Sequence, residues 1–306
     1  MPETRPVTPD ARAPWLAGAP DRLRPGLEGC AAGAMPANVA LLRLAMEATG
    51  PEEVEAALAQ ASGSAPPAAA RRLREALDLW RRNPQAFATI RSVIDGVEHG
   101  GTPARPEAWA EAFDRLAEAS PEGSVALYAL GNPDLLRAAT DEVVGRLAAW
   151  GLLGADRRAL DLGCGIGRLV AALSPRVAHV TGLDVSEGMI ARARERCAGL
   201  PNVALRVSSG RDLAGVGDGS VDLVLGADVF PYLVQAGVAE AHVAEAARVL
   251  RPGSHLAILN FSYRGDLGRD RDEVRALAHR HGFEVCRLAS GDFALWDGAT
   301  FLLRRA

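Results

Sequence analysis

This chain of 306 residues contains no lysine, because all 34 of its Lys and Arg residues are Arg. Without lysine, no Schiff base can form with a carbonyl substrate or with pyridoxal phosphate. A Walker-type loop, whose Lys reaches the β- and γ-phosphates of a nucleotide, is excluded, and so is a protein-kinase site. The chemistry that remains open is that of carboxylates, His, Cys, Tyr, backbone amides or a bound cofactor.

Cysteine and long apolar runs are also scarce. The four cysteines, Cys30, Cys164, Cys197 and Cys286, lie at least 33 residues apart, which excludes a zinc knuckle and a C-x-x-C redox pair and favours free thiols. No stretch approaches the roughly 18 to 20 apolar residues of a membrane span. Residues 1–25 carry six prolines and no apolar signal region, so we expect a cytoplasmic protein.

A basic face is missing as well. The net charge is −4 and the arginines are scattered along the chain, whereas nucleic-acid binding usually requires a concentrated basic surface. We therefore expect a small-molecule substrate, and no nucleic acid or membrane as a partner. The chain is 48% hydrophobic and 24% charged, which is typical of a globular protein with one large domain or two.

The first half of the chain is predicted to be helical. Residues 1–33 are rich in Pro, Gly and Ala and are expected to form a flexible arm. Residues 34–132 are expected to form a helical cap that selects the substrate or mediates assembly, for example as a homodimer. Apolar residues recur there and up to Trp150 with a period near 3.6, and prolines stand near the start of each segment, where a missing N–H does least harm. The helical segments expected are 39–46, 73–80, 87–97, 109–116 and 136–150.

The second half, residues 133–306, is predicted to form an α/β domain. After Gly154, short apolar runs alternate with helical patterns, which is typical of a parallel sheet covered by helices on both faces. Two final runs have no helical pattern between them and predict an antiparallel hairpin. The result is a doubly wound, seven-stranded, mostly parallel sheet. Its strands are expected at 158–162, 177–183, 203–207, 221–225, 255–261, 283–288 and 300–303.

A glycine-rich motif stands between the first predicted strand and its helix. It begins with Asp161 and continues with Gly163, Gly165 and Gly167, in the spacing G-x-G-x-G. Such glycines allow a tight turn and let a ligand approach the backbone closely. Asp184 ends the second strand, where a carboxylate could bind a ribose diol. Asp161 could instead be a turn or helix-capping residue, and Asp184 could cap the helix that starts near Ser186.

From this motif onward, residues 125–306 resemble the class I S-adenosylmethionine-dependent methyltransferases. The resemblance also rests on residues 209–213 and 217–224, which look like the end of the third strand and the acidic fourth strand, and on residues 245–256 before and within the fifth. It implies a Rossmann-like fold in which residues 133–306 bind S-adenosylmethionine and release S-adenosylhomocysteine, with no metal expected.

The resemblance also implies which residues hold the cofactor. The aspartate and backbone of the first turn would bind the amino acid end, the ammonium on the carboxylate and the carboxylate on backbone amides. Asp184 would take the ribose hydroxyls, Val185 and Met189 would flank the adenine, and the backbone near residue 210 would read its edge. The cofactor-binding residues expected are Asp161, Gly163, Cys164, Gly165, Gly167, Asp184, Val185, Met189, Gly210, Arg211, Asp212 and Asp228.

The acceptor is expected at the ends of the fourth and fifth strands. A methyl group on a sulfonium is already activated, so the site has to align the acceptor and exclude water, and a general base is needed only for some acceptors. Phe230 and Tyr232 could be walls for an apolar or aromatic acceptor, or core residues. The candidate catalytic residues are Tyr128, Asp228, Tyr232, Tyr263 and His99.

These observations predict methyl transfer to a small-molecule acceptor, at O, N or S, by in-line displacement. Two alternatives remain open. The same cofactor pocket could serve a cyclase or an aminocarboxypropyl transferase, which react differently with the sulfonium, or the chain could be a non-catalytic protein that binds the cofactor or a partner.

Overall fold

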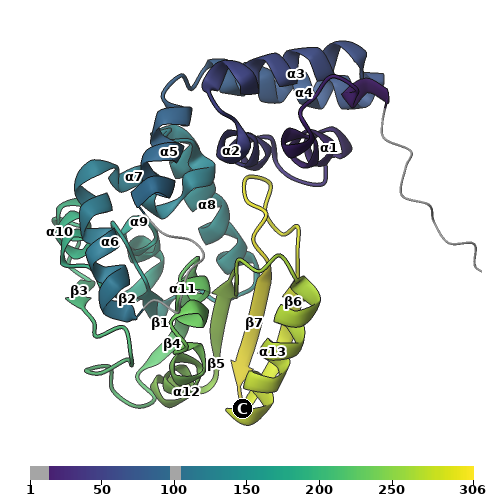
Figure 1. Cartoon of the computed structure of the whole chain (residues 1–306). Coiled ribbons are helices and arrows are strands. Elements are labelled where there is room, and N and C mark those ends of the chain that lie inside the picture. The colour runs from purple at the N-terminus through teal and green to yellow at the C-terminus, as the bar shows by residue number, and fades with distance from the viewer. Residues whose placement is uncertain (1–13, 97–104) are drawn as a thin grey trace, which may run out of the picture. The chain divides into compact units, whose positions relative to one another are not determined.

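The structure is a computed structural model that describes residues 14–96 and 105–306. The chain divides into two compact units, Met1–Phe87 and Ala88–Ala306, and each is described by itself. Figure 1 traces the chain from purple at its N-terminus to yellow at its C-terminus.

The first unit is helical throughout its described part. Residues 14–33 differ from the expected flexible arm, because Leu16, Leu23 and Leu27 are buried and the last helix of this segment packs against the fourth helix of the unit. Burial of these leucines offsets the entropy cost of ordering a segment rich in Pro and Gly. The elements of this unit are η1 (Pro14–Leu16), η2 (Asp21–Leu23), α1 (Arg24–Ala32), α2 (Ala37–Glu47), α3 (Pro51–Ser64) and α4 (Pro67–Arg81).

Further helices precede the sheet. The division between the units falls within α5 (Ala86–Gly96), so the helical region predicted at 34–132 spans parts of both units. Proline opens each of the next three α-helices, as its fixed φ favours. These elements are α6 (Pro106–Ala119), α7 (Pro121–Val125), η3 (Leu127–Ala129) and α8 (Pro133–Ala149).

A seven-stranded sheet forms the centre of the second unit. Its order is β3-β2-β1-β4-β5-β7-β6, with parallel pairing from β3 to β5 and antiparallel pairing of β7 with both β5 and β6. The strand order reverses between β1 and β4, and ligands of such sheets bind at that point, outside the carboxyl ends of the strands. The strands are β1 (Gly154–Leu162), β2 (Val177–Asp184), β3 (Val203–Val207), β4 (Val221–Ala227), β5 (Leu250–Leu259), β6 (Phe283–Ala289) and β7 (Thr300–Arg305).

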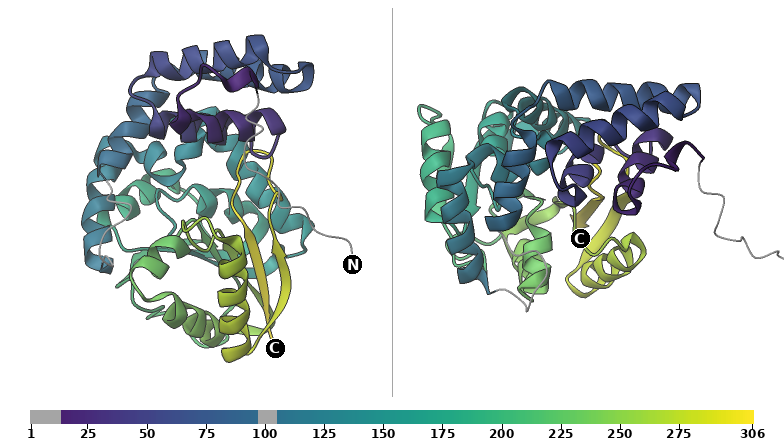
Figure 2. Two further views of the ribbon diagram at one scale, coloured as in Figure 1. Left: turned by 45° about the vertical axis from the view of Figure 1, so that its right-hand side comes forward. Right: turned by 45° about the horizontal axis from the view of Figure 1, so that its top comes forward.

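The sheet confirms the predicted fold class, including the C-terminal hairpin, which the three views show in yellow (Figures 1 and 2). Two strands begin clearly earlier than predicted, and the first of them, β1, begins at Gly154 rather than at Arg158. β5 begins at Leu250 rather than at His255, because Pro252 and Gly253 lie in an irregularity of its pairing with β4 and do not end the strand. It also ends at Leu259, so that Phe261 follows the strand.

Helices connect the strands and cover the sheet. The large core of this unit joins residues of β1, β4, β5 and β7 to α12 and α13. No helix of the described residues is long and apolar enough to cross a membrane. The helices are α9 (Arg168–Leu173), η4 (Ser174–Arg176), α10 (Glu187–Arg196), α11 (Phe230–Gln235), α12 (Ala239–Val249) and α13 (Leu267–Arg280).

Candidate functional site

The carboxyl end of β1 carries a buried aspartate with an unsatisfied oxygen. Asp161 is 1% exposed, and its Oδ2 has no hydrogen-bond partner among the described residues. Burial raises the pKa of Asp161 to about 7, while the positive charge of Arg168 opposes this shift. An orphaned buried carboxylate oxygen is costly unless a ligand donates to it. Asp161 therefore fits the ammonium group of an amino acid.

The glycine turn after β1 is compact and its backbone donors are occupied. Gly163 has a φ of 69°, and a Cβ there would lie 2.4 Å from Cγ2 of Val229, so only glycine fits. The N–H groups of Gly163 and Cys164 donate to the carbonyl of Leu183, and those of Gly165 and Gly167 also donate within the protein. These four amides are therefore engaged and do not offer the expected binding site for a carboxylate.

Asp184, at the end of β2, is held by the same turn. Its Oδ2 accepts from the N–H of Gly165 at 2.8 Å, and its Oδ1 accepts from the N–H of Ser186 at 3.0 Å. Each oxygen retains a further lone pair, which suits two adjacent ribose hydroxyls. The helix that follows is capped by the Ser186 hydroxyl, which accepts from Met189 N–H, and not by Asp184.

Asp161 likewise caps no helix, since α9 begins after Gly167 without any side-chain cap. The capping alternatives for both aspartates are therefore excluded. Burial raises the pKa of Asp184, and its backbone hydrogen bonds oppose the shift. Both buried carboxylates thus lie at the carboxyl ends of their strands, close to the point between β1 and β4 where the strand order reverses.

Helix α6 packs against the residues expected to flank an adenine. Oδ1 of Asp114 on α6 accepts from Ser186 Oγ at 2.5 Å and from Gly188 N–H at 2.9 Å, at the start of α10. Met189 of α10 is 1% exposed and belongs to a buried cluster with Trp109 and Leu116 of α6. Val185, which follows β2, is partly buried. Helix α6 thus closes this side of the site, a contact that the sequence did not indicate.

The loop after β3 also meets α6. A Cβ on Gly210 would lie 2.8 Å from Cβ of Pro106, and Arg211 forms an ion pair with Glu107 at 2.6 Å. Asp212 instead accepts hydrogen bonds from its own loop, from Ser209 Oγ and Ala214 N–H. Both side chains therefore have protein partners, and Gly210 offers a backbone that α6 approaches closely.

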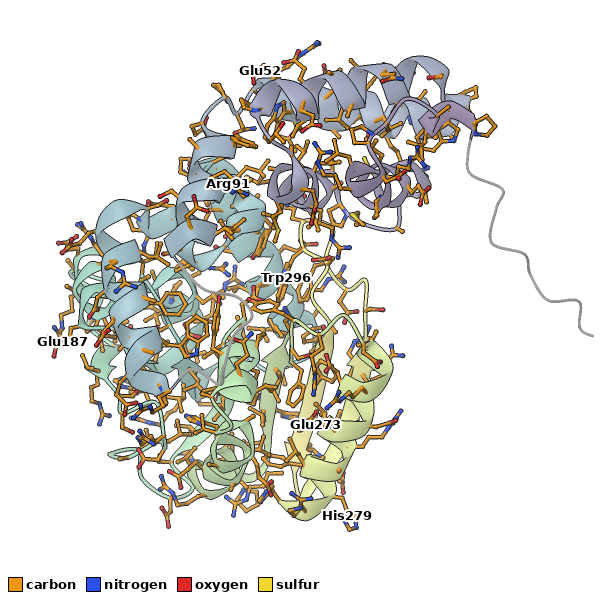
Figure 3. All side chains as sticks on the ribbon, in the orientation of Figure 1. Glu52, Arg91, Glu187, Glu273, His279 and Trp296 are labelled. Atoms are coloured by element: carbon orange, nitrogen blue, oxygen red, sulfur yellow. The ribbon has the colours of Figure 1, made fainter. Side chains whose placement is uncertain are left out.

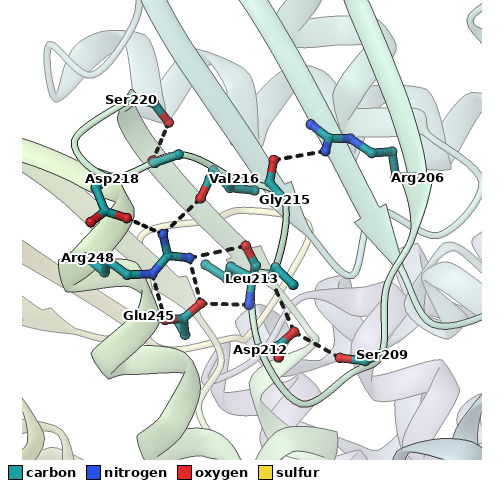
Figure 4. A network of polar contacts seen from close by, with 12 residues as sticks. Arg206, Ser209, Asp212, Leu213, Gly215, Val216, Asp218, Ser220, Glu245 and Arg248 are labelled. Carbon is teal, nitrogen blue, oxygen red and sulfur yellow. Dashed lines mark hydrogen bonds and ion pairs between the residues drawn. The ribbon is translucent and has the colours of Figure 1, made fainter.

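A second network fixes the far end of this loop (Figure 4). Arg248 of α12 makes a bidentate pair with Glu245, at 2.8 and 2.7 Å, and reaches Asp218 at 2.6 Å. It also donates to the carbonyls of Leu213 and Val216. These bonds tie the connection between β3 and β4 to α12, which stabilises the position of the loop at the site.

Two residues at the ends of β4 and β5 adopt left-handed backbone conformations. Asp228 has a φ of 57° and Asn260 a φ of 73°, and Asn260 Nδ2 donates to Asp228 Oδ1 at 3.0 Å. Non-glycine residues in this region are strained, and such strain often marks functional sites. Burial raises the pKa of Asp228 to about 6, against the opposing effects of Asn260 and Arg168. The Asp228 carboxylate is therefore held in one orientation, and its pKa lies close to neutral pH.

The three tyrosines of the chain gather around Asp228. Tyr232 on α11 and Tyr263 after β5 are hydrogen-bonded through their side chains, with ring centroids 5.8 Å apart. Asp228 and Tyr128 are close enough to Tyr263 to interact with it electrostatically. Burial raises the pKa of Tyr128 and raises that of Tyr232 to about 12, so these hydroxyls stay protonated at neutral pH. The structure thus brings four of the five predicted catalytic residues together.

Aromatic side chains that the sequence analysis did not assign to the site extend this group. The ring of Tyr232 makes edge contacts with the rings of Trp109 and Phe113, with ring centroids 4.7 Å and 5.2 Å apart. Trp296, labelled in Figure 3, is buried in the connection between β6 and β7 and stacks on Tyr128 at 5.9 Å. The i, i+4 spacing of Trp109 and Phe113 marked a helix face but not the partner of that face.

Other candidates lie elsewhere. Phe230 is fully buried and stacks on Phe261, so it is a core residue and not a wall of the acceptor site. His99 lies outside the described residues. Burial raises the pKa of Cys164 well above its ordinary value, which disfavours a thiolate nucleophile. No group of three or more His, Cys, Asp or Glu side chains in the described residues could hold a metal.

Comparison with known proteins identifies the domain that carries this site. Residues 159–253 match the methyltransferase domain family. The chain is 33% identical over 172 residues to a demethylmenaquinone methyltransferase of Tropheryma whipplei, a match that covers 56% of this chain and 64% of that protein. It is 35% identical over 101 residues to a ubiquinone biosynthesis O-methyltransferase of Methylococcus capsulatus, covering 32% and 41%. The chain thus spans less than two thirds of either relative.

A solved structure shares the fold. Magnesium protoporphyrin IX methyltransferase from Synechocystis PCC 6803, with bound S-adenosylmethionine, superimposes with a TM-score of 0.51 and 18% identity, over 68% of this chain and 100% of that one. At this identity the likeness concerns the fold alone.

Proposed function

Since residues 159–253 match the methyltransferase domain family, we propose that this protein transfers a methyl group from S-adenosylmethionine to a small-molecule acceptor by in-line displacement. The observation that carries the proposal is the gathering of Asp228 and the three tyrosines beside the glycine turn. Val229, the neighbour of Asp228, lies directly against Gly163 of that turn. A methyl donor bound at the turn would therefore present its reactive group to Asp228.

The residues at the ends of β1 and β2 fit the cofactor. Asp161 offers an unsatisfied buried oxygen for an ammonium, and Asp184 offers two oriented oxygens for a ribose diol. When bound, S-adenosylmethionine supplies a methyl group activated by a positively charged sulfur. The protein has to hold the acceptor in line with the methyl–sulfur bond and keep water away.

Asp228 would act as the general base for an acceptor that carries a proton. As the acceptor oxygen bonds to the methyl carbon, the carbon–sulfur bond breaks, its electron pair stays on sulfur, and the acceptor proton passes to a carboxylate oxygen of Asp228. Asn260 holds that carboxylate through its amide. The protonated hydroxyls of Tyr128 and Tyr232 would orient the acceptor oxygen as hydrogen-bond donors.

We further propose that the acceptor is a hydroxylated aromatic or quinol-like ring. The aromatic side chains around Tyr232 offer edges and faces on which such a ring can pack. One relative is named as a demethylmenaquinone methyltransferase and another as a ubiquinone biosynthesis O-methyltransferase, which supports a quinone-like ring as the acceptor. A hydroxyl acceptor also needs the base that Asp228 provides, whereas a thiolate would not.

Incubation with methyl-labelled S-adenosylmethionine tests the proposed activity. We expect label to enter a small product when catechols, hydroquinones or a bacterial metabolite extract are supplied, with S-adenosylhomocysteine as the by-product. Label found only in protein or RNA would contradict a small-molecule acceptor. Methylthioadenosine as the by-product would show that another carbon of the sulfonium reacts, as in cyclases and aminocarboxypropyl transferases.

The Asp228→Asn variant tests the base. We expect its kcat to fall by about 100-fold or more while its affinity for S-adenosylhomocysteine stays within about threefold. The pKa of Asp228 near 6 means that the deprotonated, active form is lost on acidification, so wild-type kcat/KM should fall below about pH 6. This acidic limb should disappear in the variant. Asp141→Asn on the exposed face of α8 is the control. An unchanged kcat in Asp228→Asn would exclude Asp228 as the general base.

A further inference from the structure

Arg168, the first residue of α9, is a buried cation without an ionic partner. It is 8% exposed. Its Nη1 donates to Thr140 Oγ1 at 3.1 Å and its Nη2 donates to Tyr128 Oη at 3.4 Å, and both acceptors are neutral hydroxyls. Among residues 14–96 and 105–306, no carboxylate oxygen lies within 4.0 Å of its guanidinium nitrogens.

Several other arginines of this unit are paired with carboxylates. Arg264 reaches Asp270 and Glu273, Arg248 reaches Glu245, and Arg287 reaches Asp292. Asp161 and Asp228 interact electrostatically with Arg168 but do not form an ion pair in contact with it. A buried charge without a contact ion pair is costly, and part of the cost is recovered when an ion of opposite sign binds directly. The position of Arg168, directly after the glycine turn, therefore indicates an anion that binds within the site.

A buried charge of opposite sign lies near Arg168. Asp161 has an oxygen without a partner, and the positive charge of Arg168 opposes the rise of its pKa. The two side chains do not touch, so a group placed between them could carry both an ammonium and a carboxylate. An α-amino acid has that pair of charges, and four amides of the glycine turn, those of Gly163, Cys164, Gly165 and Gly167, are already engaged.

We propose that Arg168 is the carboxylate receptor of the cofactor site: its guanidinium binds the α-carboxylate of the amino acid end, while Asp161 binds the ammonium. This inference rests on the proposed use of S-adenosylmethionine. It makes Arg168 a specificity residue, because decarboxylated S-adenosyl compounds keep the amine and the adenosine but lack the anion that Arg168 requires.

Calorimetric titration with two ligands tests this role. S-adenosylhomocysteine and its decarboxylated analogue differ only in the carboxylate. We expect the wild-type protein to prefer S-adenosylhomocysteine by about 10- to 100-fold, the range for a charge-assisted buried hydrogen bond. Arg168→Gln should lose most of this preference by weakening S-adenosylhomocysteine alone. Arg176→Gln, which changes an exposed arginine of η4, should retain it.

Equal wild-type affinities for the two ligands would overturn the inference, as would an Arg168→Gln variant that weakens both ligands alike. The first of these results needs no variant and so does not depend on whether Arg168→Gln folds. If Arg168→Gln fails to fold, Arg168→Lys should still prefer S-adenosylhomocysteine over its decarboxylated analogue, but by a smaller ratio. Lys keeps the positive charge but cannot donate two parallel hydrogen bonds to a carboxylate as a guanidinium does. Failure of wild-type protein to bind S-adenosylhomocysteine would contradict the proposed function itself.

Discussion

A carboxylate buried without a partner destabilises the protein that carries it, and Asp161 is such a group. Its pKa of about 7 lies above the ordinary value of 3.8, so the folded chain binds a proton there more tightly than the unfolded chain does. The stabilisation from this proton is complete below about pH 4 and is lost as the pH rises through 7. At pH 8 the ligand-free protein therefore carries an uncompensated charge that a bound ammonium would neutralise.

Asp161→Asn should stabilise the ligand-free protein and weaken ligand binding. We expect its free energy of unfolding at pH 8 to rise by on the order of 2 to 4 kcal/mol, because the amide needs no proton, and the gain should vanish near pH 4. Affinity for S-adenosylhomocysteine should fall by at least about 30-fold. Thermal melts at both pH values and calorimetry measure these effects. Asp134→Asn, at an exposed site, should change neither, and a destabilised Asp161→Asn protein at pH 8 would refute this account.

Helix α6 shapes the site as a whole element. It contacts the loop after β3 through Pro106 and Glu107, and the start of α10 through Asp114. Its apolar side carries Trp109, whose Nε1 is buried and has no hydrogen-bond partner among the described residues. One helix therefore contributes to the cofactor side of the site and to the aromatic wall beside Tyr232.

Asp114→Ala should loosen the contact between α6 and α10. The change removes two acceptor interactions at the start of α10, and we expect a loss of about 1 to 3 kcal/mol in the free energy of unfolding. The N–H of Gly188 should also exchange its hydrogen faster. Urea denaturation and hydrogen exchange measure both effects. Glu118→Ala, at an exposed position of the same helix, is the control, and equal stabilities of the two variants would exclude an anchoring role for Asp114.

Over the whole molecule, every residue assigned to cofactor binding belongs to the second unit, Ala88–Ala306. The helices of the first unit have their own core, which includes Leu23, Leu41 and Leu58. We propose that this unit serves acceptor selection or assembly of a homodimer, and not cofactor binding.

A fragment of residues 88–306 should bind S-adenosylhomocysteine with an affinity within about threefold of that of the full chain. Its residues Asp161, Arg168 and Asp184 are all retained, together with the sheet that positions them. Circular dichroism establishes that the fragment is folded, and calorimetry measures its affinity. A folded fragment that no longer binds would show that the first unit completes the cofactor site.

The fold could be predicted well from the sequence because the signals for it are local. Alternating apolar runs and helical patterns define the parallel sheet, and the turn residues near Asp292 and Gly298 define the final hairpin. The start of β5 was missed because Pro252 and Gly253 usually end a strand, and here they are accommodated within its pairing with β4. The order of residues 14–33 was missed because the burial of their leucines depends on distant helices.

The amino-acid sequence alone identifies the cofactor motif, since the spacing of Asp161, three glycines and Asp184 follows from one strand, one turn and the next strand. The reaction centre depends on contacts between segments far apart in the chain. Tyr232 and Tyr263 meet because the parallel strands β4 and β5 align their carboxyl ends at one edge of the sheet, and Tyr128 joins them from η3. The hydroxyl contacts of Arg168 also follow from three-dimensional packing, because the absence of a contact ion pair is a property of the surroundings that no sequence pattern records.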